Sequence, residues 1–113
     1  MKTQLPERSN IINEIISNFK KRASDYYGTR LYSLVLYGSY ARGDFREGSD
    51  IDILVVLNSI ESEMNEITNL TEIKTDLILE YERYLSTNPV SRDKFENSGL
   101  SFFQKVKEEG ILL

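Results

Sequence analysis

The chain has 113 residues, of which 40% are hydrophobic and 28% are charged, so we expect residues 1–113 to form a single globular domain. The formal net charge of −4 disfavours nucleic acid as a partner, because surfaces that bind phosphate backbones are usually basic. The chain contains no Cys and no His, which excludes disulfide bonds, thiol chemistry and catalysis by a histidine base. It shows neither a signal peptide nor a long apolar stretch, and we therefore expect a cytoplasmic protein without a membrane partner.

An amphipathic helix is predicted over residues 10–27. Apolar side chains recur there at helical spacing, and polar or charged residues occupy the positions between them. The apolar positions are Ile11, Ile12, Ile15, Ile16 and Phe19. We expect this stripe to pack on a sheet and Gly28 to end the helix, while Pro6 and Glu7 suit a first helical turn.

The next segment combines a strand with a sharp turn. The apolar run Tyr32–Tyr37 is rich in Leu, Val and Tyr, which predicts a strand. Gly38 allows the backbone to turn sharply and to approach a ligand closely. Ser39 is expected to cap a short helix over residues 40–42. The unpaired backbone N–H groups at such a turn form a ready site for an anion.

A second strand begins with two acidic residues, Asp50 and Asp52, and runs to Leu57. Alternate residues of a strand share a face, so the two carboxylates are expected to point the same way, about 6.6 Å apart along the strand. The rest of the run is apolar on both faces, which indicates an internal strand covered on both sides. Two like charges at its start need a partner, and Mg²⁺, which binds one or two carboxylates together with substrate phosphates, fits that requirement.

A second long helix is predicted over residues 61–82, because apolar side chains again recur at intervals of three and four. These residues are Met64, Ile67, Leu70, Ile73, Leu77 and Tyr81. Residues 77–79 could instead form a strand, which would place Asp76 beside the strand of the two acids. We then expect a third strand over residues 84–91. We place this strand at an edge of the sheet, because Pro89 cannot donate a backbone hydrogen bond.

Two short helices are predicted to complete the chain. Ser91 suits the N-cap of the first helix. Apolar residues over 100–109 indicate the second, for which Gly110 is a suitable C-terminal stop. We interpret Phe102 and Phe103 as core residues rather than as a platform for stacking adenine, because aromatic pairs are mostly buried. The last three residues are expected to pack back on the domain or to add a short edge strand.

The motif GSYARGDFREGSDID over residues 38–52 resembles the GS-x10-DxD signature of the nucleotidyltransferase superfamily related to DNA polymerase β. Most of the chain resembles the minimal nucleotidyltransferases, small domains that are often paired with HEPN proteins in toxin–antitoxin modules; the resemblance is strongest over residues 31–57. The resemblance implies an α/β (α+β) fold of the polymerase-β type, with a small mixed sheet flanked by helices. It also implies Mg²⁺-dependent transfer of AMP from ATP to a hydroxyl acceptor, and a HEPN toxin as the partner.

The resemblance assigns roles to five residues of the motif. Asp50 and Asp52 would be the catalytic residues and metal ligands. The nucleotide-binding residues would be Gly38 and Ser39 at the turn, together with Arg42, whose guanidinium fork suits phosphate oxygens.

A third carboxylate, which many members of the superfamily supply from a later strand, is the open point. Matched to the family, the segment NPVSRDKF places Asn88 where that acid would stand, and a neutral amide is a weaker ligand for a hard cation. Either two carboxylates suffice, or Asp76, Glu80 or Asp93 substitutes. Alternatively, the chain is a weak or inactive descendant that acts as a binding antitoxin. Transfer to a small molecule is a further alternative, which the small size of the chain disfavours.

Overall fold

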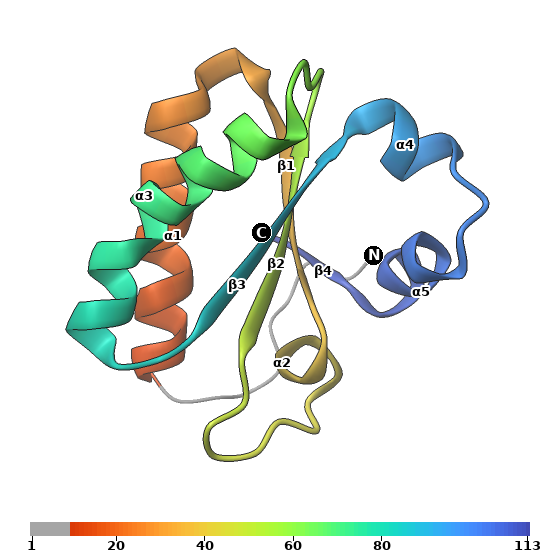
Figure 1. The fold of residues 1–113 in the computed structure, drawn as a ribbon. Coiled ribbons are helices and arrows are strands. Elements are labelled where there is room, and N and C mark those ends of the chain that lie inside the picture. The colour runs from red at the N-terminus through yellow and green to blue at the C-terminus, as the bar shows by residue number, and fades with distance from the viewer. Residues whose placement is uncertain (1–9) are drawn as a thin grey trace.

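The computed structural model describes residues 10–113, so Pro6 and Glu7 lie outside the described residues. All the predicted helices and strands are confirmed (Figure 1), and a short 3-10 turn and a two-residue edge strand join them. In chain order the elements are α1 (Asn10–Tyr27), η1 (Gly28–Arg30), β1 (Leu31–Tyr37), α2 (Ser39–Arg42), β2 (Ile51–Leu57), α3 (Glu63–Tyr81), β3 (Leu85–Ser91), α4 (Arg92–Asn97), α5 (Ser101–Glu109) and β4 (Ile111–Leu112).

The four strands form one mixed sheet in the order β3-β2-β1-β4. The central strands β1 and β2 are antiparallel, and β4 is antiparallel to β1 at one edge. At the other edge, β3 runs parallel to β2, with α3 forming the crossover that a parallel pair requires. The edge position of β3 agrees with the expectation from Pro89.

Helices cover both faces of the sheet (Figure 1). The long helices α1 and α3 lie side by side on one face, and α4 and α5 lie on the other. The side chains of β2 alternate between the two cores. Ile51, Ile53, Val55 and Leu57 belong to the core under α1 and α3, whereas Leu54 and Val56 belong to the core under α4 and α5. The internal position predicted for this strand is therefore confirmed.

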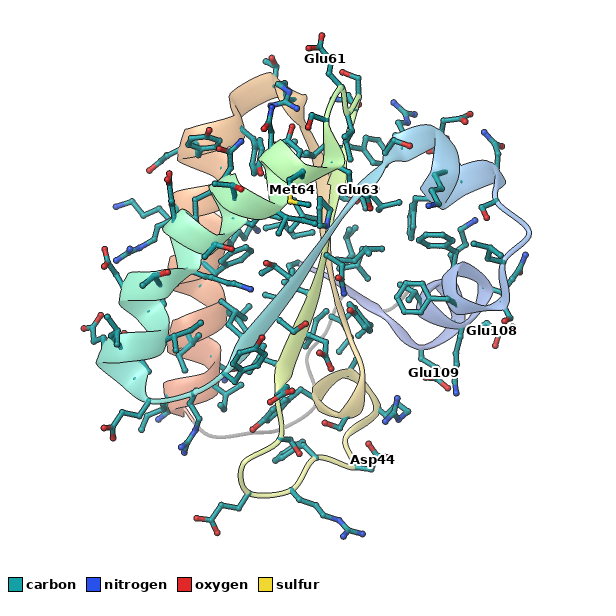
Figure 2. The ribbon with its side chains drawn as sticks, in the orientation of Figure 1. Asp44, Glu61, Glu63, Met64, Glu108 and Glu109 are labelled. Atoms are coloured by element: carbon teal, nitrogen blue, oxygen red, sulfur yellow. The ribbon has the colours of Figure 1, made fainter. Side chains whose placement is uncertain are left out.

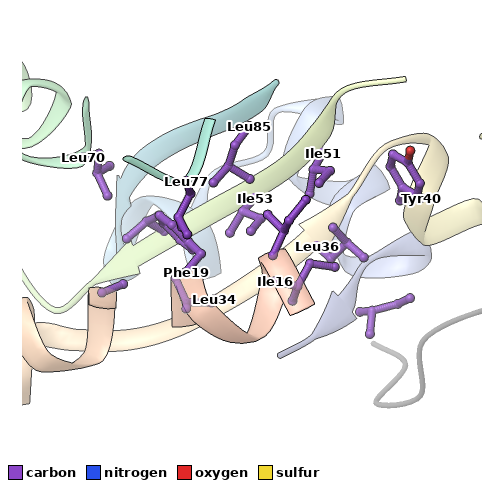
Figure 3. Packing of buried hydrophobic residues seen from close by; sticks show 14 of the residues in the cluster. Ile16, Phe19, Leu34, Leu36, Tyr40, Ile51, Ile53, Leu70, Leu77 and Leu85 are labelled. Atoms are coloured by element: carbon purple, nitrogen blue, oxygen red, sulfur yellow. The ribbon is translucent and has the colours of Figure 1, made fainter. Parts of the chain in front are cut away.

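The larger core lies between the sheet and the two long helices. Figure 3 shows Phe19 of α1, Leu34 of β1 and Leu77 of α3 packed together. Phe19 is fully buried, and burial of a side chain of this kind contributes about 1.5–3 kcal/mol to stability. The predicted stripe of α1 needs one correction: Ile11 is 49% exposed, because it lies beside the stripe on the helix rather than within it.

The start of α3 departs from a purely apolar stripe. Met64 and Ile67 are exposed, and Glu66 is buried in their place. Arg30 of η1 donates a hydrogen bond to Glu66 Oε2, and Asn69 Nδ2 donates to Oε1 at 3.2 Å. These bonds compensate for the burial of a carboxylate. The ion pair joins α3 to the start of β1, at the opposite end of this strand from Gly38.

None of the helices within residues 10–113 is both long and apolar enough to cross a membrane.

Candidate active site

The end of β1 forms the first wall of the candidate site. Gly38 follows the strand with φ 76° and ψ −157°, a conformation that residues with a β-carbon rarely adopt. Its carbonyl accepts hydrogen bonds from Ala41 and Arg42, both at 3.1 Å, so Gly38 is the N-cap of α2. The prediction that Ser39 caps this helix is wrong, because Ser39 is already its first residue. The Ser39 hydroxyl makes no hydrogen bond within the described part of the chain, which leaves it able to donate to a ligand.

The second wall is the carboxylate of Asp52. The antiparallel register pairs Asp52 with Tyr37, the last residue of β1. The side chain of Asp52 therefore lies against the turn: a β-carbon added to Gly38 would stand 2.4 Å from Asp52 Oδ2. Only glycine allows this carboxylate to approach the backbone so closely. The turn and the acid, which are 14 residues apart in sequence, thus meet as one site.

Asp50 stands one residue before β2. The strand begins at Ile51, whose N–H donates to the carbonyl of Tyr84 at 3.0 Å. Asp50 is exposed, whereas Asp52 is half-buried. Burial raises the pKa of Asp52, the nearby charge of Asp50 raises it further, and Arg42 opposes both effects. The two acids are thus close enough for the charge of Asp50 to affect the pKa of Asp52.

A divalent cation fits this donor set. Two carboxylates beside a free serine hydroxyl provide the hard oxygen ligands that Mg²⁺ prefers, with room for phosphate oxygens and water to complete its shell. A cation would also remove the repulsion that raises the pKa of Asp52. Within residues 10–113, however, no three His, Cys, Asp or Glu side chains are grouped to hold a metal ion. Two carboxylates fit a metal that is held jointly with a substrate.

The third strand brings Ser86, rather than an acid, next to Asp52. The parallel register pairs Asp52 with Ser86 and Leu54 with Asn88. Asn88 thus lies two residues further along β3, where its Nδ2 donates a hydrogen bond to the hydroxyl of Tyr37. Sequence reasoning missed Ser86 because the register between two parallel strands leaves no local signal in the sequence.

The other candidates for a third carboxylate lie away from Asp52. Asp76 is on α3, on the opposite face of the sheet, 3.5 Å from Arg22 of α1. Glu80 belongs to the same helix. Asp93 follows the C-terminal end of β3, whereas Asp52 pairs near the N-terminal end of that strand. Within residues 10–113, none of the three is grouped with Asp50 and Asp52 to hold a metal ion.

Arg42 lies close to the site and is held by two acids. Its Nε is 3.2 Å from Asp44 Oδ2, and its Nη1 is 3.6 Å from Glu109 Oε2. Figure 2 shows that Asp44 comes from the loop after α2 and Glu109 from the end of α5. Both carboxylates are partly exposed, so phosphate oxygens could compete with them for the guanidinium.

The sequence matches the model of the family described as "Nucleotidyltransferase domain" over residues 16–113. The chain belongs to the nucleotidyltransferase family. A protein of Methanocaldococcus jannaschii named "Putative protein adenylyltransferase MJ0141" is 33% identical over 100 residues, which cover 88% of this chain and 96% of that protein. "Protein adenylyltransferase MntA" of Thermococcus cleftensis is 34% identical over 74 residues, covering 60% of this chain and 73% of the relative.

Solved structures share the fold of this nucleotidyltransferase. The structure described as "toxin-antitoxin with AMP-PNP" matches with a TM-score of 0.59 and 20% identity over 92% of this chain and 72% of that one. A variant of "the toxin-antitoxin MntA-HpeT" matches with a TM-score of 0.57 and 21% identity over 94% of this chain and 72% of its own. With the mixed sheet and its flanking helices, these matches confirm the polymerase-β-like fold that the resemblance implied.

Proposed function

We propose that this nucleotidyltransferase transfers AMP from ATP to a hydroxyl group on a partner protein. The observation that carries the proposal is the contact between the Asp52 carboxylate and the Gly38 backbone. It joins a carboxylate that can bind a metal to the turn at Gly38, and a phosphate against that turn would lie beside the acid. The names of the relatives, protein adenylyltransferases, support the choice of AMP as the transferred group.

The residues of the site would have different roles in this reaction. Ser39 and Arg42 would donate hydrogen bonds to the phosphates, and Asp50 and Asp52 would hold Mg²⁺. When bound, the metal would supply positive charge that stabilises the transferring phosphate and the departing pyrophosphate. The acceptor oxygen forms a bond to the α-phosphorus and its proton passes to solvent water. The bond from that phosphorus to the bridging oxygen breaks, and pyrophosphate leaves. Positioning and charge neutralisation dominate such reactions, which is compatible with the absence of His from the chain.

The acceptor that we propose is a hydroxyl on a toxin of the HEPN class. Two kinds of comparison support a toxin as the partner. Structures of the same fold are described as toxin–antitoxin complexes, one of them with an ATP analogue. A relative is named MntA, and the same name stands in the description of one of those complexes. The chain would then be an antitoxin that acts by modifying its partner.

A binding antitoxin without catalysis is the second candidate. The observation in its favour is the pairing of Asp52 with Ser86, which leaves β3, Leu85–Ser91, without a carboxylate. A chain of this kind would neutralise its partner by contact alone.

Labelling of the partner separates the two candidates. The toxin encoded beside this chain is incubated with the chain, Mg²⁺ and ATP that carries a radiolabel in the α-phosphate. We expect a labelled toxin with the native chain and an unlabelled toxin with the double variant Asp50→Asn, Asp52→Asn. The matched control is Asp25→Asn with Asp76→Asn, which removes two exposed carboxylates from the opposite face of the sheet. Stable binding without label by the native chain would support the binding antitoxin and contradict the enzyme.

A further inference from the structure

A pocket adjoins the turn at Gly38. Its volume is about 230 Å³. Tyr37, Gly38 and Arg42 line it from the end of β1 and from α2, and Phe102, Lys105 and Glu109 line it from α5. Because Gly38 borders both the pocket and the Asp52 carboxylate, a ligand held at the two acids can continue directly into this space.

The position of α5 beside the turn is fixed by packing. Phe103 and Val106 are buried in the smaller core with Val35. At the end of the helix, a β-carbon on Gly110 would stand 2.7 Å from Val35 Cγ1, so α5 approaches β1 as closely as a glycine permits. Lys105, next to Val106, is therefore presented to the pocket by a helix whose backbone cannot easily shift.

Phe102 forms an apolar wall of the pocket. It is 44% exposed, and its ring meets that of Tyr37 edge-on at 5.5 Å between centroids. Our interpretation of both phenylalanines as core residues is therefore correct for Phe103 and wrong for Phe102. The two cations beside this wall, Lys105 and Arg42, are both exposed.

The two cations of the pocket differ in their ion-pair partners. Arg42 has Asp44 and Glu109 as partners. Within residues 10–113, no carboxylate lies at ion-pair distance from Lys105. The pocket thus offers an unpaired ammonium group beside a guanidinium whose partners can be exchanged.

We propose that Lys105 binds the β- and γ-phosphates of the nucleoside triphosphate in this pocket, and that Arg42 joins it by exchanging Glu109 for phosphate oxygens. This inference rests on the proposed function, which places the α-phosphate at Asp50 and Asp52. The two outer phosphates then need cations next to Gly38. Lysine serves well as a point charge for phosphate, and arginine adds directed hydrogen bonds.

Calorimetric titration with ATP, AMP and inorganic pyrophosphate, each with Mg²⁺, tests the role of Lys105. We expect Lys105→Ala to weaken the binding of ATP and pyrophosphate about tenfold, the size of one lost charge-assisted hydrogen bond, and to leave the binding of AMP unchanged. Lys105→Arg should retain most of the affinity. The matched control is Lys20→Ala, which removes an exposed lysine from α1 on the other face of the sheet.

The outcomes distinguish this inference from the proposed function. If the native chain binds ATP and Lys105→Ala binds it equally well, the role of Lys105 is refuted and the proposed function stands. If Lys105→Ala weakens the binding of ATP and of AMP equally, the role of Lys105 is also refuted, because the effect would not depend on the outer phosphates. If the native chain binds no ATP and labels no partner, both proposals are overturned.

Discussion

Asp52 Oδ2 occupies almost the position that a β-carbon on Gly38 would take, 2.4 Å from it. This relationship ties the shape of the turn to the position of the carboxylate. Any side chain at residue 38 must displace the acid that the proposed chemistry needs, in addition to straining the backbone at φ 76°.

Replacement of Gly38 by alanine tests this relationship. We expect Gly38→Ala to lower the free energy of unfolding by about 1–3 kcal/mol and to abolish transfer of AMP, because the new methyl group pushes Asp52 away. The matched control is Gly48→Ala. Gly48 also has a positive φ, 83°, but a β-carbon there meets no atom within 4 Å. Urea unfolding and partner labelling should show strain alone for Gly48→Ala; loss of labelling in both variants would contradict the account.

The pKa of Asp52 has a consequence for stability. Burial, and then the charge of Asp50, raise the pKa of Asp52, so the folded chain holds this proton more tightly than the unfolded chain. The ionised carboxylate therefore costs stability at pH values above its folded-state pKa. We expect Asp52→Asn to increase the free energy of unfolding near neutral pH while it abolishes transfer.

Urea unfolding at two pH values tests whether Asp52→Asn raises the free energy of unfolding as expected. The gain from Asp52→Asn should be present at about pH 7 and should vanish at about pH 3, where native Asp52 is protonated. Asp25→Asn, an exposed change on α1, should have no such effect. If Asp52→Asn is less stable than the native chain at neutral pH, the charge of Asp52 stabilises the fold and the expected sign is wrong.

A carboxylate at residue 86 should complete the metal site. Ser86 pairs with Asp52, whereas Asn88 pairs with Leu54 and bonds to Tyr37. We expect Ser86→Asp to tighten the binding of Mn²⁺, measured by calorimetry, about tenfold or more, because a third hard oxygen ligand joins the two acids. Asn88→Asp is the control, because it adds the same charge two residues further along the strand. A larger gain from Asn88→Asp would mean that the sequence match, and not the strand register, identifies the position of the third ligand.

The buried ion pair at the other end of β1 should affect stability and not chemistry. Burial, the largest influence, acts to raise the pKa of Glu66, but hydrogen bonds from Arg30 and Asn69 lower it overall. The ionised form is thus favoured in the folded chain, and this stability is lost as the pH falls through the folded-state pKa.

Glu66→Gln removes the charge and keeps the shape. We expect a loss of about 2 kcal/mol at neutral pH, a smaller loss in acid, and unchanged transfer per folded molecule. Glu63→Gln, an exposed change on the same helix, should be nearly neutral in urea unfolding. Equal effects of the two substitutions would contradict a specific role for the pair with Arg30.

The elements of the fold could be predicted because each depends on local periodicity. The alternation after Asp52 correctly assigned the side chains of β2 to two faces, and the family motif joined Gly38 to the acids. These features are encoded within a few neighbouring residues, so the sequence alone reveals them.

The remaining features depend on contacts between distant segments. Whether Ser86 or Asn88 stands beside Asp52 depends on a strand register, which no local pattern specifies. The exposure of Phe102 depends on how α5 rests on β1. Ser39 offers a typical capping side chain, but the hydrogen bonds of Gly38 place the start of α2 one residue earlier.

The central claim, transfer of a nucleotide, is tested most directly by the phosphate that reaches the partner. The toxin is incubated with the native chain and ATP that is radiolabelled either in the α-phosphate or in the γ-phosphate. The account predicts that the α-label alone becomes attached to the toxin, because pyrophosphate carries the γ-label away. Attachment of the γ-label, or of neither label, would contradict it.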